Sequence, residues 1–389
     1  MEQTYQALYM PKLVTGRGSL AFFATLGKKR IGVIRGGRSY SAQVQDTVES
    51  LAAQTGAEVR CLAQIRNEPL IEDIFRATEA VRDFQPDMIL AIGGGSVLDT
   101  AKAIHLFYEN PDMTFEEATR PYCLPALGKK AVHVSVPTTS GTGSETTSCA
   151  VFIDPETHVK RLLLDNGIIP HYAILDASAT DSLPPSITVA TGMDALTHAI
   201  ESSTALNSTV LTRAIALEAA VDILESLRAA AAPEDTPARR DARERMHIAA
   251  SMAGIAITNS CTGICHSYDH PGPAFGLAHG LVCGLMLPYS MEMIGPHPSY
   301  SALARRLGYT GDDTALMQAL KQHILTLSTG LGLPTSFRAR GIDETEYLSK
   351  TAQWAKESLP AFATAVSPAA MDEKKGILFL KNCYYGEAL

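Results

Sequence analysis

This chain has few cysteines, no long apolar run and no excess of basic residues. Its 389 residues include only seven cysteines, an odd number without the spacing of a disulfide framework, so we expect reduced thiols. No apolar run approaches the length of a membrane-spanning helix. The 33 basic residues are outnumbered by 41 acidic ones, giving a net charge of −8, and no basic run stands out. We therefore expect neither a membrane nor a nucleic-acid partner.

The N-terminus also lacks a targeting pattern. Its first residues, Met1 to Tyr5, show neither a basic leader nor an apolar core, the two parts of a secretion signal, so we expect a cytoplasmic protein. A chain of 389 residues exceeds a usual single core, which makes two domains the default expectation.

The two halves of the chain differ in their periodicity. The first half alternates apolar runs with amphipathic segments, and it predicts strands at 30–35, 58–63, 87–92 and 131–136 and helices at 41–55, 71–84 and 97–108. Such alternation indicates a parallel sheet with helical crossovers. After residue 183 the helical period dominates, with helices predicted at 187–202, 209–228 and 238–257. We therefore predict an α/β domain over residues 1–183 and an all-α domain over residues 184–389.

A possible metal site lies in the second half. Asp194 and His198 are one helical turn apart, so on a helix they share a face and can close on one ion. Three more histidines, His266, His270 and His279, crowd a later stretch rich in Gly and Pro. Two of them would complete a set of one carboxylate and three imidazoles. That set suits Fe(II), Zn or Mn better than Mg or Ca.

Two glycine-rich loops follow predicted strands in the first half. Residues 93–96 separate a strand from a helix, and residues 137–145 follow the next strand. Glycines there let backbone amides approach a phosphate, and a helix N-terminus adds a partial positive charge. Neither loop matches the G-x-G-x-x-G fingerprint, and each alone could be an ordinary tight turn. Together, at neighbouring strand ends, they indicate a ligand crevice in an open α/β sheet.

These segments resemble a known family. Four motifs occur in the order found in iron-dependent (group III) alcohol dehydrogenases: GGGSVLDTAK at 93–102, PTTSGTGSE at 137–145, ATGMDALTHAIE at 190–201, and the histidine block at 266–279. The resemblance covers essentially the whole chain. It implies a dinucleotide-binding domain over 1–183, a helical metal-binding and catalytic domain over 184–389, and an active site in the cleft between them. It also implies at least a homodimer formed through the N-terminal strand.

The resemblance assigns roles to individual residues. It implies that the metal ligands are Asp194, His198, His266 and His279, with Fe(II) as the metal and Zn or Mn as alternatives. It places His270 near the nicotinamide and the substrate, although from the residues alone His270 is also a fifth candidate ligand or a loop-stabilising residue. Asp99 and Lys102 are candidates for placing the nicotinamide or ribose, with helix packing and an exposed ion pair as the alternative. The remaining cofactor-binding candidates are Gly94, Gly95, Ser96, Thr138, Thr139, Thr142 and Ser144.

The nucleotide preference is partly readable at the end of the first long strand. Family members that prefer NAD carry an acidic residue there, whereas this chain has Gly36 at about that position. Losing the carboxylate removes repulsion against a 2′-phosphate, and nearby arginines could contact one. A surface turn that touches nothing is the alternative. We favour NADP(H) over NAD(H), with the candidate contacts Gly36, Gly37, Arg38 and Ser39.

Two departures from the family pattern concern the substrate pocket. The gap from His270 to His279 is one residue shorter than in the best-known members, and Asp269 stands where they carry a small apolar residue. Its carboxylate could raise the pKa of a neighbouring imidazole or reject anionic substrates, or it could point to solvent.

The predicted activity is hydride transfer between NADP(H) or NAD(H) and a small alcohol or aldehyde. One alternative is a lyase resembling dehydroquinate synthase, which uses NAD transiently, but its phosphorylated acid would require basic residues that are missing around 266–279. The other alternative is a metal- and nucleotide-binding protein without turnover. An open metal site beside a nicotinamide would serve no purpose in such a protein.

Overall fold

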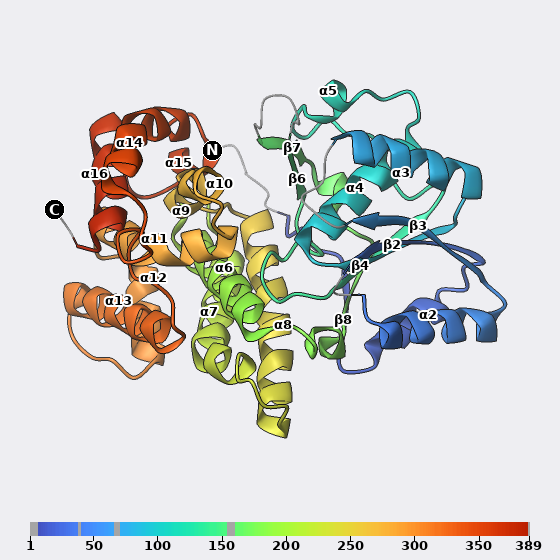
Figure 1. Cartoon of the computed structure of the whole chain (residues 1–389), viewed down its shortest axis with the longest axis horizontal. Coiled ribbons are helices and arrows are strands. Elements are labelled where there is room, and N and C mark those ends of the chain that lie inside the picture. Colours follow the sequence, from blue (N-terminus) through green and yellow to red (C-terminus); the bar gives the residue numbers. More distant parts are fainter. Residues whose placement is uncertain (1–6, 38–39, 66–70, 154–159, 388–389) are drawn as a thin grey trace, which may run out of the picture. The chain divides into compact units, whose positions relative to one another are not determined.

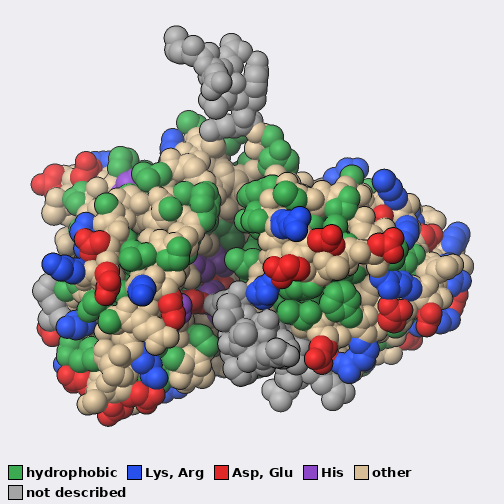
Figure 2. All heavy atoms as spheres, turned by 90° about the horizontal axis from the view of Figure 1, so that it is seen from above, with side chains coloured by type: hydrophobic (Ala, Val, Ile, Leu, Met, Phe, Trp, Pro, Cys, Tyr) green, Lys and Arg blue, Asp and Glu red, His purple; other side chains and the backbone are tan. Residues whose placement is uncertain are grey.

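The structure is a computed structural model that describes residues 7–37, 40–65, 71–153 and 160–387. The chain forms two compact units, the N-terminal unit Met1–Leu183 and the C-terminal unit Pro184–Leu389 (Figure 1). Within the described stretches, no helix is both long enough and apolar enough to cross a membrane. Acidic and basic side chains are mingled over the face of the molecule that Figure 2 shows.

A six-stranded sheet forms the centre of the N-terminal unit, and all of its strand pairs are parallel. The predicted parallel sheet is thus confirmed, with each predicted strand displaced by at most two residues at its ends. The spatial order is β1-β8-β5-β4-β2-β3, and a separate antiparallel pair joins β6 and β7. The strands are β1 (Lys12–Thr15), β2 (Arg30–Gly36), β3 (Glu58–Ile65), β4 (Met88–Gly93), β5 (Val132–Pro137), β6 (Cys149–Ile153), β7 (Lys160–Leu164) and β8 (Tyr172–Leu175).

Helices cover both faces of this sheet, as Figure 1 shows. The central strand β4 explains why: its Ile89 and Ala91 enter one core with α3 and α4, while its Leu90 and Ile92 enter the other core with α1 and α2. A strand buried on both faces has to be apolar throughout, which is why its sequence shows no alternation. The helices of this unit are α1 (Phe22–Thr25), α2 (Ala42–Thr55), α3 (Ile71–Phe84), α4 (Gly95–Glu109) and α5 (Phe115–Ala118).

The C-terminal unit contains helices and connecting loops, without a strand, over its described residues 184–387. Its long helices start where sequence signals place them: Pro185 and Pro237 occupy first-turn positions, and Thr209 and Thr236 are N-caps. The helices are α6 (Pro185–Thr204), α7 (Val210–Ala230), α8 (Pro237–Thr258), α9 (Ile264–Ser267), α10 (Pro271–Ala274), α11 (His279–Ile294), α12 (Pro298–Arg306), α13 (Asp313–Gly330), α14 (Glu344–Ser358), α15 (Phe362–Ala365) and α16 (Glu373–Tyr385).

Helix α6 lies at the centre of this unit. It packs against α7, α8 and α11, and every residue from Gly192 to Thr204 is buried. Its core includes Met193, Leu196 and Ile200. A helix with this surrounding holds its side chains rigidly, so any polar residue on it needs a partner inside the fold.

Candidate metal centre

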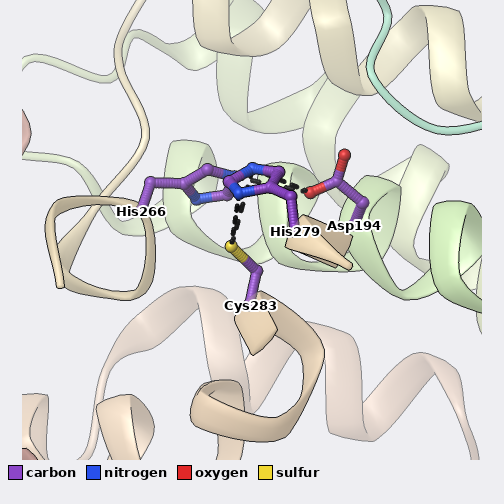
Figure 3. Close-up of side chains that lie close together, drawn as sticks. All are labelled: Asp194, His266, His279 and Cys283. Carbon is purple, nitrogen blue, oxygen red and sulfur yellow. Dashed lines mark hydrogen bonds and ion pairs between the residues drawn. The ribbon is translucent and has the colours of Figure 1, made fainter. Parts of the chain in front are cut away.

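Three helices of the C-terminal unit bring four potential metal ligands together (Figure 3). Asp194 comes from α6 and His266 from α9, while His279 and Cys283 come from successive turns of α11. One donor atom of each residue lies within 4.8 Å of the donor atoms of the other three. Among the described residues this is the one such group of three or more His, Cys, Asp or Glu side chains.

Gly280 allows α11 to start close enough to α6 for these side chains to meet. A Cβ atom at this position would lie 2.2 Å from the backbone oxygen of Ala190 and 2.9 Å from the Asp194 Cβ. No other residue type fits against the α6 backbone at that distance. The close approach places His279, the first residue of α11, beside Asp194.

Unpaired polar atoms point into the middle of the group. Asp194 Oδ1 lies 3.6 Å from the Nε2 atoms of both His266 and His279, too far for a hydrogen bond. Asp194 Oδ1 and His266 Nε2 are both buried without a hydrogen-bond partner. Buried polar atoms in a folded protein are nearly always paired, so these atoms fit the role of ligands to a cation. A carboxylate with imidazoles suits Fe(II), Zn(II) or Mn(II).

Two buried carboxylates orient the imidazoles. The Nδ1 of His266 lies 2.6 Å from Glu201 Oε2, and the Nδ1 of His279 lies 2.8 Å from Asp269 Oδ2. Because an ionised carboxylate only accepts hydrogen bonds, each Nδ1 carries a proton, which leaves Nε2 as the atom of each ring that can offer a lone pair to a metal. Those lone pairs belong to the atoms nearest Asp194 Oδ1. Carboxylates that orient metal-binding histidines in this way are common behind metal centres.

Glu201 is held by more than the imidazole. Its carboxylate also accepts the backbone N–H groups of Gly263 at 2.8 Å and Cys265 at 2.6 Å. Burial by itself raises the pKa of Glu201, but His266 and these two N–H groups outweigh burial and lower it. The same balance operates at Asp194, where burial raises the pKa and the imidazoles of His198 and His279 bring it below its ordinary value. Both carboxylates are therefore anions at neutral pH.

The side chain of Asp269 points into the candidate metal centre. Its side chain is buried and directed at His279, so the solvent-facing alternative is wrong. In this position its negative charge assists an imidazole of the candidate centre.

His198 lies beside the group but outside the closest set. Its Nε2 is 3.9 Å from Asp194 Oδ1, and its ring stacks on that of His266 with centroids 4.5 Å apart. Burial lowers the pKa of His198 to about 4, so its imidazole is neutral and keeps a lone pair for a metal. His198 therefore stays a candidate ligand, as the helical spacing predicts.

His270 does not join the cluster. Its Nε2 lies 3.0 Å from Ser358 Oγ, and its ring is parallel to that of Trp354 at 6.3 Å. Its Nδ1 lies 3.9 Å from the carboxylate of Glu357, and its side chain is 28% exposed. His270 is therefore outside the closest group of donor atoms, and its role near the nicotinamide and the substrate stays a prediction.

The two glycine-rich loops lie side by side in the N-terminal unit. A Cβ at Gly95 would lie 2.8 Å from the Thr142 side chain, so the first turn of α4 touches the loop after β5. Gly94 is the N-cap of α4 and Gly95 its first residue. The strands that precede the two loops are neighbours in the sheet. The loops therefore form one surface at the carboxyl ends of β4 and β5.

Asp99 and Lys102 connect α4 to the second loop and to the chain that follows it. Asp99 accepts the Ser144 hydroxyl at 2.5 Å and the Val151 N–H at 3.0 Å. Lys102 is fully buried and donates to Thr147 Oγ1 at 2.9 Å and to the Cys149 carbonyl at 2.7 Å. Burial raises the pKa of Asp99 and lowers that of Lys102, and the attraction between their charges opposes both shifts. The exposed ion pair considered for Lys102 is thus a buried one.

The segment expected to contact the adenosine ribose is described only in part. Gly36 ends β2, and Gly37 follows it. Arg38 and Ser39 lie outside the described residues. The guanidinium of Arg35 lies over the Tyr40 ring, 5.0 Å from its centroid, and its Nε is 3.4 Å from Cys61 Sγ.

Two residues of the centre were not predicted from the sequence. Cys283 lies one helical turn after His279, a spacing that could have indicated it. Glu201 lies one turn further along α6 than His198 but meets His266, which follows it by 65 residues. That contact depends on how the loop before α9 folds back, and no local signal carries it.

Two family models together match most of the chain. "Iron-containing alcohol dehydrogenase" matches residues 11–177, and the C-terminal model of the Fe-containing alcohol dehydrogenase family matches residues 188–382.

Individual relatives agree with these models. An NADPH-dependent butanol dehydrogenase of Clostridium saccharobutylicum is 33% identical over 376 residues, which cover 95% of this chain and 96% of that protein. An alcohol dehydrogenase of Thermococcus barophilus is 34% identical, covering 87% of this chain and 88% of the other. The solved structure of an iron-containing alcohol dehydrogenase from Thermococcus thioreducens superposes with a TM-score of 0.89 at 30% identity, covering 98% of this chain and all of that one.

Proposed function

Starting from the fact that this chain belongs to the iron-containing alcohol dehydrogenase family, whose members are oxidoreductases acting on alcohols and aldehydes, we propose that it is a metal-dependent enzyme that prefers NADP(H). Its substrates are small alcohols and the corresponding aldehydes. It works in the cytoplasm as a homodimer or a higher homo-oligomer.

One observation carries the proposal: buried, unpaired donor atoms converge on one point. Asp194 Oδ1 and His266 Nε2 lack hydrogen-bond partners, and His279 Nε2 is equally close to the carboxylate. A purely structural cluster would pair these atoms with one another or with backbone groups. The proposed ligands are Asp194, His198, His266 and His279, and the ion is Fe(II), with Zn(II) or Mn(II) able to replace it.

A divalent ion held there supplies Lewis-acid stabilisation of the negative charge that develops on the substrate oxygen during hydride transfer. The residues that contact the proposed ligands fix the orientation of the ligand side chains. Glu201 and Asp269 hold two imidazoles in the tautomer that presents Nε2, and the buried α6 fixes Asp194. His270 is a partly exposed imidazole within hydrogen-bonding distance of Ser358, so it can hold a proton and exchange it with solvent.

The nicotinamide cofactor binds the N-terminal unit at the two adjacent loops. Backbone amides at the start of α4 and in the loop after β5 receive the phosphates, and Asp99 and Lys102 hold those loops in register. The proposed contacts are Gly36, Gly37, Arg38, Ser39, Gly94, Gly95, Ser96, Asp99, Thr138, Thr139, Thr142 and Ser144. The preference for NADP(H) rests on Gly36, which places no carboxylate against a 2′-phosphate, and the butanol dehydrogenase relative is NADPH-dependent.

The test is an anaerobic assay of metal-stripped protein. Oxidation of NADPH and NADH is followed with a panel of short aldehydes, before and after addition of Fe(II), Zn(II) or Mn(II). We expect no turnover without metal, recovery with at least one ion, and faster turnover with NADPH. His266→Ala protein should lose turnover and still bind NADPH.

The outcomes separate the parts of the proposal. Faster turnover with NADH would contradict only the cofactor preference. Full turnover after metal removal, or in the His266→Ala variant, would contradict the ligand assignment. Nucleotide binding without turnover under any condition would contradict the dehydrogenase assignment and favour a lyase or a binding protein. Elution of the protein as a monomer would contradict the proposed oligomer.

A further inference from the structure

We propose that Ser358 is a positioning residue that acts through His270. Its hydroxyl accepts a hydrogen bond from Nε2 of His270, so that Nδ1 is the ring atom that takes up and releases a proton. The inference rests on the proposed function, because it concerns the imidazole that the family resemblance places near the nicotinamide and the substrate. It adds the residue that holds this ring and the atom at which the ring exchanges its proton.

The hydroxyl of Ser358 lies among three polar atoms. Ser358 is the last residue of α14, and its side chain is buried. Its Oγ lies 2.7 Å from the carbonyl oxygen of Ser267 and 2.9 Å from that of Trp354. The third neighbour is Nε2 of His270, at 3.0 Å. Because a hydroxyl has one proton to donate and two lone pairs that accept, it can donate to only one of these atoms at a time.

The carbonyl of Ser267 is the neighbour that needs this proton. Ser267 ends the short helix α9, and the last carbonyls of a helix have no N–H partner within it. The carbonyl of Trp354 lies four residues before Ser358 in the same helix, so the backbone N–H of residue 358 is its usual partner. The distance to the Ser267 carbonyl is also the shorter of the two. The Ser358 hydroxyl therefore donates to Ser267.

This direction fixes the tautomer of the imidazole. With its proton given to Ser267, Ser358 Oγ faces His270 with its lone pairs and accepts a hydrogen bond from Nε2–H. A neutral imidazole carries one ring proton, so the lone pair of His270 is then on Nδ1. A ring without this hydrogen bond could carry its proton on either nitrogen.

A carboxylate lies beside the atom that is left to exchange its proton. The carboxylate of Glu357, the residue before Ser358, is 3.9 Å from Nδ1 of His270, and 47% of its side chain is exposed. Its negative charge favours the imidazolium that forms when Nδ1 is protonated, and its exposure brings solvent to the pair. Asp269, the acidic neighbour of His270 in the chain, directs its carboxylate at His279.

The two ring nitrogens thus have separate tasks. Reduction of an aldehyde adds a hydride to carbon and requires one proton on oxygen, and oxidation of an alcohol releases that proton. In the first direction the imidazolium of His270 gives up its Nδ1 proton, and in the second the neutral ring takes one up there. The bond between Nε2 and its hydrogen stays intact throughout, because Ser358 holds it.

The first experiment reads the tautomer in the full-length protein with Zn(II) added as a diamagnetic ion. The histidine rings are labelled with ¹⁵N, and the NMR shifts of the ring nitrogens distinguish a protonated nitrogen from one with a lone pair. Among the 11 histidines, the His270 signals are identified by their loss in His270→Asn. At about pH 9, where an imidazole is neutral, we expect His270 to carry its proton on Nε2 alone.

Two substitutions at Ser358 test its role. In Ser358→Ala the His270 shifts should move to the average of two tautomers, and kcat should fall at least about tenfold with little change in KM. This loss is part of the roughly 10²- to 10⁴-fold that a positioned proton donor contributes. Ser358→Thr keeps the hydroxyl and should restore both the tautomer and kcat.

A matched control removes a different hydroxyl at the same helix end. Thr364 Oγ1 donates to the carbonyl of Ser358 at 2.8 Å, and its side chain is buried. Thr364→Val therefore disturbs the end of α14 without removing the acceptor at His270. We expect it to keep the natural tautomer and the natural kcat.

The other outcomes overturn the inference in recognisable ways. A proton on Nδ1 of His270 in the natural protein would reverse the hydrogen bond and leave the proposed function intact. An unaltered tautomer and kcat in Ser358→Ala would remove Ser358 from this role. Equal losses of kcat in Ser358→Ala, Ser358→Thr and Thr364→Val would assign the effect to packing. If the natural protein turns over no alcohol or aldehyde, the proposed function fails, and the spectra still decide which nitrogen carries the proton.

Discussion

The Nδ1 atom of His279 lies 2.8 Å from the Oδ2 atom of Asp269, ten residues earlier in the chain. The carboxylate is buried, whereas the His279 side chain is 44% exposed. An exposed imidazole can rotate unless a hydrogen bond fixes it, and the carboxylate of Asp269 accepts that hydrogen bond from His279. The short, turn-rich segment from α10 to α11 is what brings the two together.

Replacing Asp269 should therefore weaken metal binding. Asp269→Ala removes the acceptor that fixes the His279 tautomer, and we expect Zn(II) affinity to fall about 10- to 100-fold. Competition with a chromophoric chelator measures the change. Asp112→Ala, at an exposed carboxylate far along the chain from the centre, is the control and should leave the affinity unaltered. Equal affinities for the natural protein and Asp269→Ala would show that His279 needs no orienting partner.

Replacing Glu201 should affect both the metal and the fold. Its carboxylate accepts the N–H groups of Gly263 and Cys265 as well as the His266 ring. In Glu201→Gln the side-chain NH₂ group faces N–H groups that need an acceptor. We therefore expect a loss of about 1–3 kcal/mol in unfolding free energy even without metal. Urea unfolding of the metal-free protein tests this. The Asp269 carboxylate contacts the imidazole of His279, which is partly exposed. The Asp269→Ala variant should therefore lose much less stability in the same experiment.

Gly280 should not tolerate a methyl group. In Gly280→Ala the new Cβ would lie 2.2 Å from the backbone oxygen of Ala190, so α11 must move away from α6 and carry His279 with it. We expect a loss of about 1–3 kcal/mol in unfolding free energy and much weaker metal binding. Gly272→Ala is the matched control, since its Cβ would meet its nearest neighbours at 3.6 Å, an ordinary contact. Similar behaviour of the two variants would rule out the close approach as the cause.

A histidine cluster in the N-terminal unit should make stability depend on pH. The rings of His105 and His133 lie 5.4 Å apart, and the backbone N–H of His133 donates to His171 Nδ1 at 3.1 Å. Burial and the neighbouring imidazoles lower the pKa values of His133 and His171. Below about pH 6.5 these histidines therefore bind protons in the unfolded chain but stay neutral in the folded chain. The free energy of unfolding then falls by up to about 1.4 kcal/mol per pH unit for each such histidine.

The direction of this effect can be checked by urea unfolding between pH 8 and pH 5. The contribution of His133 and His171 should be constant at the alkaline end and should reduce the unfolding free energy once the pH drops below about 6.5. His133→Leu should flatten the curve, because it removes a buried group that must stay neutral. Glu109, whose pKa is about 2 because His105 and backbone N–H groups outweigh its burial, adds a further loss only below about pH 4.5. An unchanged slope in His133→Leu would exclude this histidine as the source.

Sequence patterns predict the fold well wherever a local signal is long. Strand β4 is apolar over its whole length and was predicted, whereas β1 and β8 have four residues each and carry too little pattern to be recognised. The helices predicted at 187–202 and 209–228 are α6 and α7, which begin at Pro185 and at Val210. Each of these predictions depends on neighbours within a few residues.

The residues of the candidate metal centre also fall into those that a local sequence pattern predicts and those that it does not. Asp194 and His198 follow from helical spacing, and the histidine block stands out by its density. The direction of Asp269 and the contact of Glu201 with His266 depend on loops whose backbone course no short pattern encodes. Cys283 was missed because a cysteine inside an apolar helix is usually a packing residue, and only the approach of α11 to α6 shows what it faces.

The nucleotide preference can be reversed at Gly36, the last residue of β2. Gly36→Asp places a carboxylate where the resemblance puts the adenosine ribose, so it should repel a 2′-phosphate and accept hydrogen bonds from free ribose hydroxyls. We expect the ratio of kcat/KM for NADPH to that for NADH to fall at least about tenfold, equivalent to about 1.4 kcal/mol. Gly36→Asn has nearly the same size without the charge and should shift the ratio much less. If both variants change the ratio equally, bulk rather than charge sets the preference, and if neither does, the ribose lies elsewhere.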